Sequence, residues 1–524
     1  MLSVVMQVIL LTFEAEYVKE RNLVFGNQNE EKDPRLGLKY YGPYRYESEN
    51  DAQDIIKVGL IGDSATIQKA NSILELIKKE IPVDSSNKWL FPPFPGISKK
   101  TNFKCDVVTS INWQETLSTS EISSLLKILD ANERIGAAVK LYIEKIKNIL
   151  SEDNPPAVII CTLPKEIEEY CGISERTRGA KTPKVTKLEK LIAEFKKENQ
   201  TFLTQWGVDV SQKVEEKTFG YDFRNSLKGK VMDLQNAVPI QLLRESTMDV
   251  VLKYGELKAP TKQDPASFAW NFSTAMFYKA NGKPWRLAKL AQDSCYIGIS
   301  FYRNKLSPNQ EIQTSMAQVF THNGEGLVLR GTEVYLEENS KEPHLTENQA
   351  YSLLKDSINR YIQKAARNPS RIVIHKSSLY TVAEKEGFNK AINELNIPNI
   401  KKDFVTISNK TGIRFLRLGS YPVLRGTLIN LEQNKFLLYT SGYTPRVRTY
   451  PGHSIPRPLL ITHEGDSSNN IICDEILGLT KLNWNTTAFA TYMPITLGFA
   501  GKVGQILSEL SPSGYLQNHY KFYM

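Results

Sequence analysis

Short apolar runs alternate with amphipathic stretches through the first half of the chain. Runs that predict strands lie at residues 55–62, 105–110, 157–161 and 238–243. Between them, the residues up to Leu76 and those at 137–150 carry apolar side chains at helical spacing. Because strands that alternate with helices usually lie side by side in the same direction, the first half predicts a parallel sheet.

The second half shows a different order of elements. Two prolines within residues 258–265 mark a boundary, and a helix is predicted directly after it at 268–280. Predicted strands follow at 295–301, 317–320, 326–334, 371–375 and within 404–439, with helices at 347–366 and 494–510. Antiparallel strands followed by strand–helix alternation are typical of an RNase H-like domain. The chain is therefore predicted to be α/β, with an N-terminal segment of edge strands at 1–50 and domains at 51–260 and 261–524.

Composition narrows the possible partners and compartments. Lys and Arg number 66 against 57 Asp and Glu, so the net charge of +9 permits a polyanionic partner without requiring one. The five cysteines form no CxxC pair and the six histidines no HxH or HExxH pair, which disfavours a disulfide framework and a zinc site and fits a cytoplasmic protein. No stretch reaches the roughly 18 apolar residues that a membrane span needs. The apolar residues 1–13 are predicted to be an edge strand.

A phosphate site is one interpretation of the segment at 221–230. Arg224, Lys228 and Lys230 are spaced so that at least two of them share one helix face, and Gln241 offers an amide from the next strand. A terminal phosphate binds such a mixture of cations and neutral donors. Spacing alone favours the alternative, a solvated basic helix face.

A second segment shifts that balance. Residues 269–285 read AWNFSTAMFYKANGKPW, a helix that carries Lys279 at its end, followed by a glycine turn, a proline and a tryptophan. This segment resembles the first helix of the PIWI domain of Argonaute proteins. The resemblance implies that Arg224, Lys228, Gln241 and Lys279 hold the 5′-phosphate of a guide strand, and that a Mg²⁺ ion accompanies this phosphate. A further lysine of many long members is Ala275 here.

The C-terminal third extends the resemblance, which covers residues 220–520 well and 20–220 loosely. The segments at 440–443, 453–458, 476–484 and 492–496 match Argonaute motifs in the same order. They imply a Rossmann-like MID domain followed by an RNase H-like PIWI domain, without a PAZ domain. We expect four cations of this region to contact the guide or target backbone, namely Arg446, Arg448, Arg457 and Lys481; for the arginines, a solvated role is the alternative.

The positions of the nuclease ligands are the test of catalysis. An RNase H-like nuclease holds two divalent metals between carboxylates. Where the family places its first and second aspartates this chain has Ser300 and Ser377, and Gly501 stands where the last helix supplies a histidine or aspartate. The resemblance therefore implies no cleavage by this chain. A guide-directed nuclease with atypical metal ligands is the alternative, and an RNase H-like structural protein without nucleic acid is a third, remote reading.

The segments at 22–27, 33–38 and 41–43 resemble the start of short prokaryotic Argonautes. Those proteins consist of a MID domain and an inactive PIWI domain. That likeness implies a guide RNA, a single-stranded DNA target and a partner that carries an APAZ region. The partner's effector is a TIR or sirtuin-like NAD hydrolase, or less commonly a nuclease, and is activated by target binding as an immune response. The apolar residues 1–13 and the strand at 23–25 are the surfaces expected to contact the partner.

Overall fold

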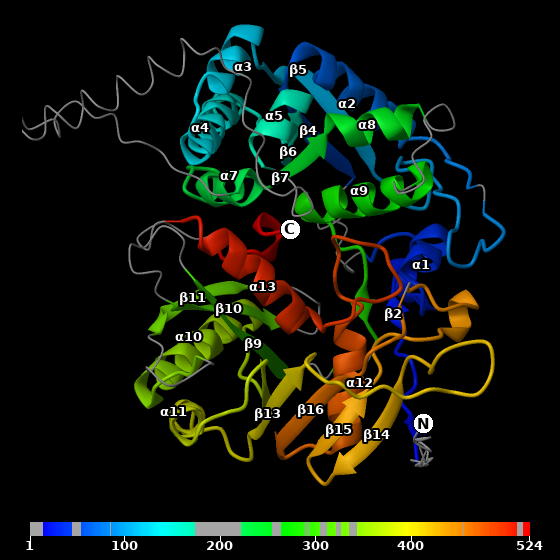
Figure 1. Cartoon of the computed structure of the whole chain (residues 1–524), viewed down its shortest axis with the longest axis vertical. Helices are drawn as coiled ribbons and strands as arrows, with labels where there is room; N and C mark the ends of the chain where they lie inside the picture. The colour runs from blue at the N-terminus through cyan, green and yellow to red at the C-terminus, as the bar shows by residue number, and fades with distance from the viewer. Residues whose placement is uncertain are drawn as a thin grey trace, which may run out of the picture.

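The computed structural model describes residues 14–44, 54–83, 85–172, 222–253, 264–288, 290, 293–303, 312–320, 326–334, 343–452, 454–510 and 517–524. These residues form two α/β bodies, which Figure 1 shows one above the other. The first body is built on a four-stranded sheet and the second on a nine-stranded sheet. No helix in the described ranges is long and apolar enough to cross a membrane.

The four-stranded sheet is parallel throughout, in the order β5-β4-β6-β7, as the sequence predicts. Its strands are β4 (Ile55–Gly62), β5 (Asp106–Thr116), β6 (Val158–Leu163) and β7 (Ile240–Arg244). The helices of this body are α2 (Ser64–Leu76), α3 (Thr119–Leu126), α4 (Ala131–Leu150), α5 (Lys165–Tyr170), α7 (Phe223–Met232) and α8 (Glu245–Leu252). Helix α4 begins earlier than predicted because the Asp130 side chain accepts a hydrogen bond from Glu133 N and caps it there.

The nine-stranded sheet has the order β1-β14-β15-β16-β13-β12-β9-β10-β11. Its strands in the second half of the chain are β9 (Ser294–Arg303), β10 (Ile312–Phe320), β11 (Val328–Val334), β12 (Arg371–Lys376), β13 (Lys401–Ser408), β14 (Thr427–Glu432), β15 (Lys435–Leu438) and β16 (Leu459–Gly465). Strands β9, β10 and β11 are antiparallel, whereas β9, β12 and β13 are parallel. This is the predicted order, and it confirms the α/β fold class.

Helices cover both faces of this sheet. They are α10 (Glu347–Ala365), α11 (Val382–Asn393), α12 (Asn469–Leu479) and α13 (Ile495–Leu507), whereas α9 (Pro265–Lys279) packs against α8 of the first body. Cys295, Ile297 and Ile299 of β9 pack in one cluster with residues of α10 and α11. The alternate residues of β9 face α13, because a Cβ at Gly298 would lie 2.0 Å from Thr496 O. Only glycine permits this close approach of helix and strand.

The N-terminal segment pairs with strands of the second body. Strand β1 (Glu16–Tyr17) pairs with β14, and β2 (Leu23–Val24) lies between β3 (Glu30–Glu31) and β8 (Arg286–Leu287). Helix α1 (Pro34–Tyr41) follows. Leu23 and Phe25 are fully buried, so the expectation that this strand offers a surface to a partner is wrong. Residues 1–13 lie outside the described part of the chain, and so do residues 254–263, where the domain boundary is predicted.

A buried ion network supports the centre of the second sheet. Arg371 on β12 donates to Asp403 at 2.7 Å and to Glu475 at 2.5 and 3.0 Å, and His463 on β16 lies 2.9 Å from Asp403. Burial opposes protonation of His463, but its hydrogen bonds with Asp403 and Asn469 prevail and raise its pKa. The raised pKa favours the charged imidazole, which balances the second carboxylate.

This network predicts a pH effect on stability. A raised folded-state pKa means that the contribution of His463 is fully present below its unfolded pKa of about 6.5 and is lost as the pH rises through the folded value. We expect the thermal midpoint of unfolding to decrease as the pH is raised from 6 to 8. The decrease should be smaller in His463→Gln. Equal pH slopes for the two proteins would contradict this assignment.

Candidate nucleic-acid interface

Three elements bring the predicted phosphate ligands together where the two bodies meet. Helix α7 carries Arg224 and Lys228, β7 carries Gln241, and Lys279 is the last residue of α9. Asp222 caps α7 by accepting from Asn225 N. Figure 1 shows α7 close to α13 of the second body, and the Cβ of a residue replacing Gly229 would lie 2.6 Å from Leu510.

Both lysines of this site are buried. Lys279 is 1% exposed, and its Nζ donates to Ile240 O at 3.0 Å and to Gln241 Oε1 at 2.5 Å. Lys228 is 3% exposed and donates to the main-chain oxygen of Met524. Sequence spacing favoured a solvated basic face, but burial excludes that reading for Lys228. The residues predicted from the resemblance therefore lie together in the structure.

The electrostatics of the site favour an anion. Burial and the nearby charge of Arg224 lower the pKa of Lys279 to about 7. Burial also lowers the pKa of Lys228 well below its ordinary range, with further contributions from Arg224, Lys279 and Lys502. Cations that repel one another in a low-dielectric environment are strongly stabilised when an anion binds among them. We call Arg224, Lys228, Lys279 and Lys502 the cation cluster.

Lys502 was missed from the sequence. It lies on α13, one residue after Gly501, and is half-buried. Nothing in the local sequence pattern of α13 distinguishes Lys502 from a solvated lysine. Only its distance from Lys228 in space reveals it.

The cation cluster predicts a pH dependence of phosphate recognition. Because the pKa of Lys279 is about 7 rather than its ordinary 10.5, the free protein gains stability as the pH rises between these values. A bound phosphate dianion instead requires the protonated amine. We therefore expect the preference for a 5′-phosphorylated over a 5′-hydroxyl strand to fall above pH 7, by up to about tenfold per pH unit. Titration of both affinities from pH 6.5 to 9 tests this, with Lys279→Met as the variant that should show a flatter profile.

Mg²⁺ at this phosphate stays a prediction. Among the described residues of the site, Gln241 Oε1 and the main-chain oxygen of Met524 are oxygens of the kind that Mg²⁺ prefers, but each already accepts from a lysine. Throughout the described ranges, no group of three or more His, Cys, Asp or Glu side chains is placed to hold a metal ion.

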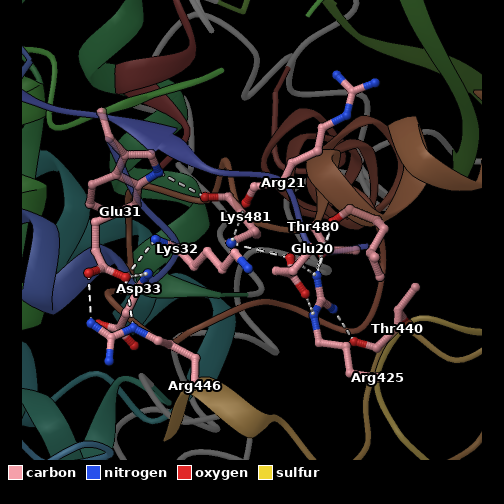
Figure 2. Close-up of polar contacts among 12 residues, drawn as sticks. Glu20, Arg21, Glu31, Lys32, Asp33, Arg425, Thr440, Arg446, Thr480 and Lys481 are labelled. Carbon is pink, nitrogen blue, oxygen red and sulfur yellow. Dashed lines mark hydrogen bonds and ion pairs between the residues drawn. The ribbon is translucent and has the colours of Figure 1, made fainter. Parts of the chain in front are cut away.

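The four cations predicted to contact the backbone lie in a second region, and two of them are engaged by carboxylates. Lys481 is 2% exposed; its Nζ donates to Arg21 O at 3.0 Å and lies 3.2 Å from Glu20 Oε1 (Figure 2). Glu20 also pairs with Arg425 at 2.8 Å, and these two cations overcome the effect of burial and lower the pKa of Glu20 to about 2. Lys481 thus joins the N-terminal segment to the second body, and its contact with a strand stays a prediction.

Arg446 and Arg448 lie beside an exposed tryptophan. Arg446 donates two hydrogen bonds to Glu31, at 2.8 and 2.7 Å, and its guanidinium lies 5.1 Å from the ring of Trp89. Arg448 is exposed and lies 4.7 Å from the same ring, and Arg457 is exposed. Arg446 could exchange its carboxylate partner for a phosphate. The contact of these three arginines with a strand stays a prediction.

The three positions of the nuclease ligands come from β9, the residue after β12, and α13. Ser300 lies between Gly298 and Tyr302, which both face α13, and Ser377 comes two residues after His375, whose Nδ1 lies 2.8 Å from Thr496 Oγ1 of α13. Ile299 and Lys376 are the last pair of the β9–β12 register, and Ser300 and Ser377 each follow directly after it in the sequence.

Gly501 lies on the helix that packs against β9. Thr496 of α13 is beside Gly298, and Gly504 is beside Tyr302, so the helix runs along β9 and Gly501 falls between these two contacts in the sequence. A Cβ at Gly501 would meet no atom within 4 Å. The side chains of the three positions supply two hydroxyls and no carboxylate.

Solved structures provide the comparison with known proteins, since no model of a protein family and no curated protein sequence matches the chain. Clostridium butyricum Argonaute bound to a guide DNA and a 19-mer target DNA is 14% identical, with a TM-score of 0.58. Aa-Ago with externally bound siRNA is 13% identical with a TM-score of 0.55, and Marinitoga piezophila Argonaute with a 5′ OH guide RNA is 13% identical with a TM-score of 0.53.

Each comparison covers 97% of this chain and 55%, 56% and 59% of the three solved chains, respectively. At this level of identity the similarity establishes the fold, and it confirms the predicted MID–PIWI arrangement. The chain has the fold of Argonaute proteins over a little more than half of their length.

Proposed function

We propose that this chain is a guide-directed nucleic-acid binding subunit. It holds a short 5′-phosphorylated guide, RNA in the leading hypothesis, and pairs it with single-stranded DNA. The observation that carries the proposal is the cation cluster, whose buried lysines have lowered pKa values and which an anion would stabilise. The three solved Argonautes were determined with guide DNA and target DNA, with siRNA or with guide RNA. Their ligands support a nucleic-acid strand as the molecule that supplies the anion.

Base pairing would provide sequence specificity in this mechanism. The protein contributes the anchor for the 5′ end and positive charge along the backbone, where Arg448 and Arg457 are exposed. The chain itself does not cut, because Ser300, Ser377 and Gly501 offer no carboxylate for a divalent metal.

Strands that copurify with the protein test the proposal directly. Short oligonucleotides should be recovered from the chain purified from cells, and their 5′ ends should accept a kinase label only after phosphatase treatment. The double variant Lys228→Met/Lys279→Met should retain far fewer of them. Recovery of no short strands, or of strands with free 5′ hydroxyls, would contradict the proposal.

We further propose that target binding is passed to a second polypeptide. By the resemblance to short prokaryotic Argonautes, this partner carries an APAZ region and an effector that hydrolyses NAD⁺, which would deplete the cofactor in cells invaded by a phage or plasmid. Coexpression with the product of the neighbouring gene should give one heterodimer on size exclusion. NAD⁺ loss should require guide, complementary target and both chains. Separate elution of the two chains with guide and target present would reject the partner.

A further inference from the structure

Helix α7, which carries two members of the cation cluster, is anchored in the first body. Phe223, Leu227 and Val231 recur at one helical turn and lie on one side of α7. All three are buried in a single apolar cluster with residues of the four-stranded sheet and of α4. The position of Arg224 and Lys228 is therefore set by the core of the first body.

Another side of the same helix contacts the second body. Ser226 and Gly229 are three residues apart and so lie next to each other on the helix surface. Ser226 Oγ donates to Glu509 Oε2 at 2.7 Å, and Gly229 lies against Leu510, which a Cβ at this position would approach to 2.6 Å. Figure 1 shows α7 beside α13, whose end these two residues follow. We call the hydrogen bond between Ser226 and Glu509 the α7–α13 joint.

Both side chains of the α7–α13 joint are buried. Ser226 is 5% exposed and Glu509 is 3% exposed. Hydrogen bonds that a carboxylate accepts are stronger than those between neutral groups, and a buried carboxylate that loses a donor is destabilised. The joint therefore fixes the distance between α7 and the end of α13 more firmly than an apolar contact would.

The cation cluster is divided between the two bodies, and the division coincides with this joint. Lys279 belongs with the first body, because its Nζ donates to Ile240 O and Gln241 Oε1 on β7. Lys502 is the one member of the cluster that α13 carries. Burial lowers the pKa of Lys228, and the charge of Lys502 contributes to this shift together with those of Arg224 and Lys279. The amine of Lys502 is therefore near the other three cations, although it belongs to the opposite body.

We propose that Ser226 and Glu509 are positioning residues for recognition of the 5′-phosphate. Their hydrogen bond holds α13 against α7, so that Lys502 reaches the phosphate that the cations of the first body hold. The attraction between an ammonium and a phosphate falls with distance, so a small shift of α13 would remove much of the contribution of Lys502. The inference rests on the proposed function, because the phosphate is that of the bound guide.

The experiment measures the ratio of the affinities of the full chain for 5′-phosphorylated and 5′-hydroxyl guides. Lys502→Met should lower this ratio about tenfold, as expected for one charge-assisted contact, and Ser226→Ala should lower it about fivefold because Lys502 is then misplaced. Glu509→Gln keeps an oxygen that accepts from Ser226, so its ratio should change by less than about twofold. In Ser226→Ala/Lys502→Met, the ratio should equal that of Lys502→Met within about twofold, because only one contact is lost.

Ser357→Ala is the matched control for the loss of a buried serine hydroxyl. Ser357 is fully buried on α10 of the second body, and its Oγ donates to Leu353 O at 2.5 Å. Helix α10 packs on the face of β9 opposite to α13. This variant should leave the affinity ratio unchanged, whatever change it causes in the thermal midpoint of unfolding.

The double variant decides between positioning and a general effect on stability. Losses that multiply in Ser226→Ala/Lys502→Met overturn the proposal, since Ser226 then acts independently of Lys502. An unchanged ratio in Ser226→Ala or in Lys502→Met also overturns it, and so does a loss in Glu509→Gln as large as that in Ser226→Ala. These results leave the proposed function intact as long as the unmutated protein prefers the phosphorylated guide. Equal affinities of the unmutated protein for the two guides overturn the proposed function itself.

Discussion

Replacing Lys279 by methionine should weaken binding of a 5′-phosphorylated guide by about tenfold to hundredfold, because each charge-assisted contact contributes about 1.5–3 kcal/mol. Lys228→Met should have an effect of the same size. Methionine approximates the length and volume of the lysine stem, so these variants remove charge with little change in packing. Direct titration of a labelled guide measures the loss, and a 5′-hydroxyl guide of the same sequence should lose much less.

Lys230 provides the matched control for this experiment. It lies on the same helix as Lys228 but is only partly buried, and Lys230→Met should change the guide affinity by less than twofold. The free energy of unfolding of Lys279→Met without guide should not decrease much, because the amine is costly to bury at neutral pH. Equal affinities of the unmutated protein for phosphorylated and hydroxyl guides would reject the site.

The target strand should stay intact when the chain is given guide, target and Mg²⁺ or Mn²⁺, and Ser300→Asp alone should not restore cleavage. One carboxylate cannot hold the two metal ions of an RNase H-like site while Ser377 and Gly501 supply none. Gel analysis of a labelled target, with a cleaving Argonaute as the positive control, measures the outcome. A product cut at one fixed distance from the guide's 5′ end would favour the alternative of atypical metal ligands.

A triple variant tests whether the fold still presents the three positions. Ser300→Asp/Ser377→Asp/Gly501→Asp would place one carboxylate on β9, one directly after β12 and one on α13, where a side chain at Gly501 meets open space. This variant should bind Mn²⁺ in calorimetry, whereas Ser300→Asp should bind it far more weakly. Equal binding by the two variants would show that the three positions do not converge.

Sequence patterns predicted the elements better than the surroundings of individual charges. The strands β4 and β12 and the helix α9 follow from local apolar runs, and Lys279 follows from a motif that ends that helix. Periodicity is a local property, so a chain of this composition reveals it without a structure.

The environment of a charged side chain depends instead on residues distant in sequence. Arg446 is 415 residues from Glu31, and Arg371 is 104 residues from Glu475. No local pattern links such pairs, so the sequence could not indicate that Lys481 is buried or that Lys502 faces Lys228.

The pairing of the N-terminal segment with residues far along the chain has a consequence for biosynthesis. Glu20 forms its ion pair with Arg425, which lies 405 residues later in the sequence, and β1 pairs with β14. A ribosome that adds about 5–20 residues per second needs roughly 20–80 s to supply that distance. During this interval residues 14–31 emerge before the side chains that neutralise and cover them, and their apolar strand is open to other chains. Production in a heterologous host should therefore depend strongly on translation speed, temperature and chaperone supply.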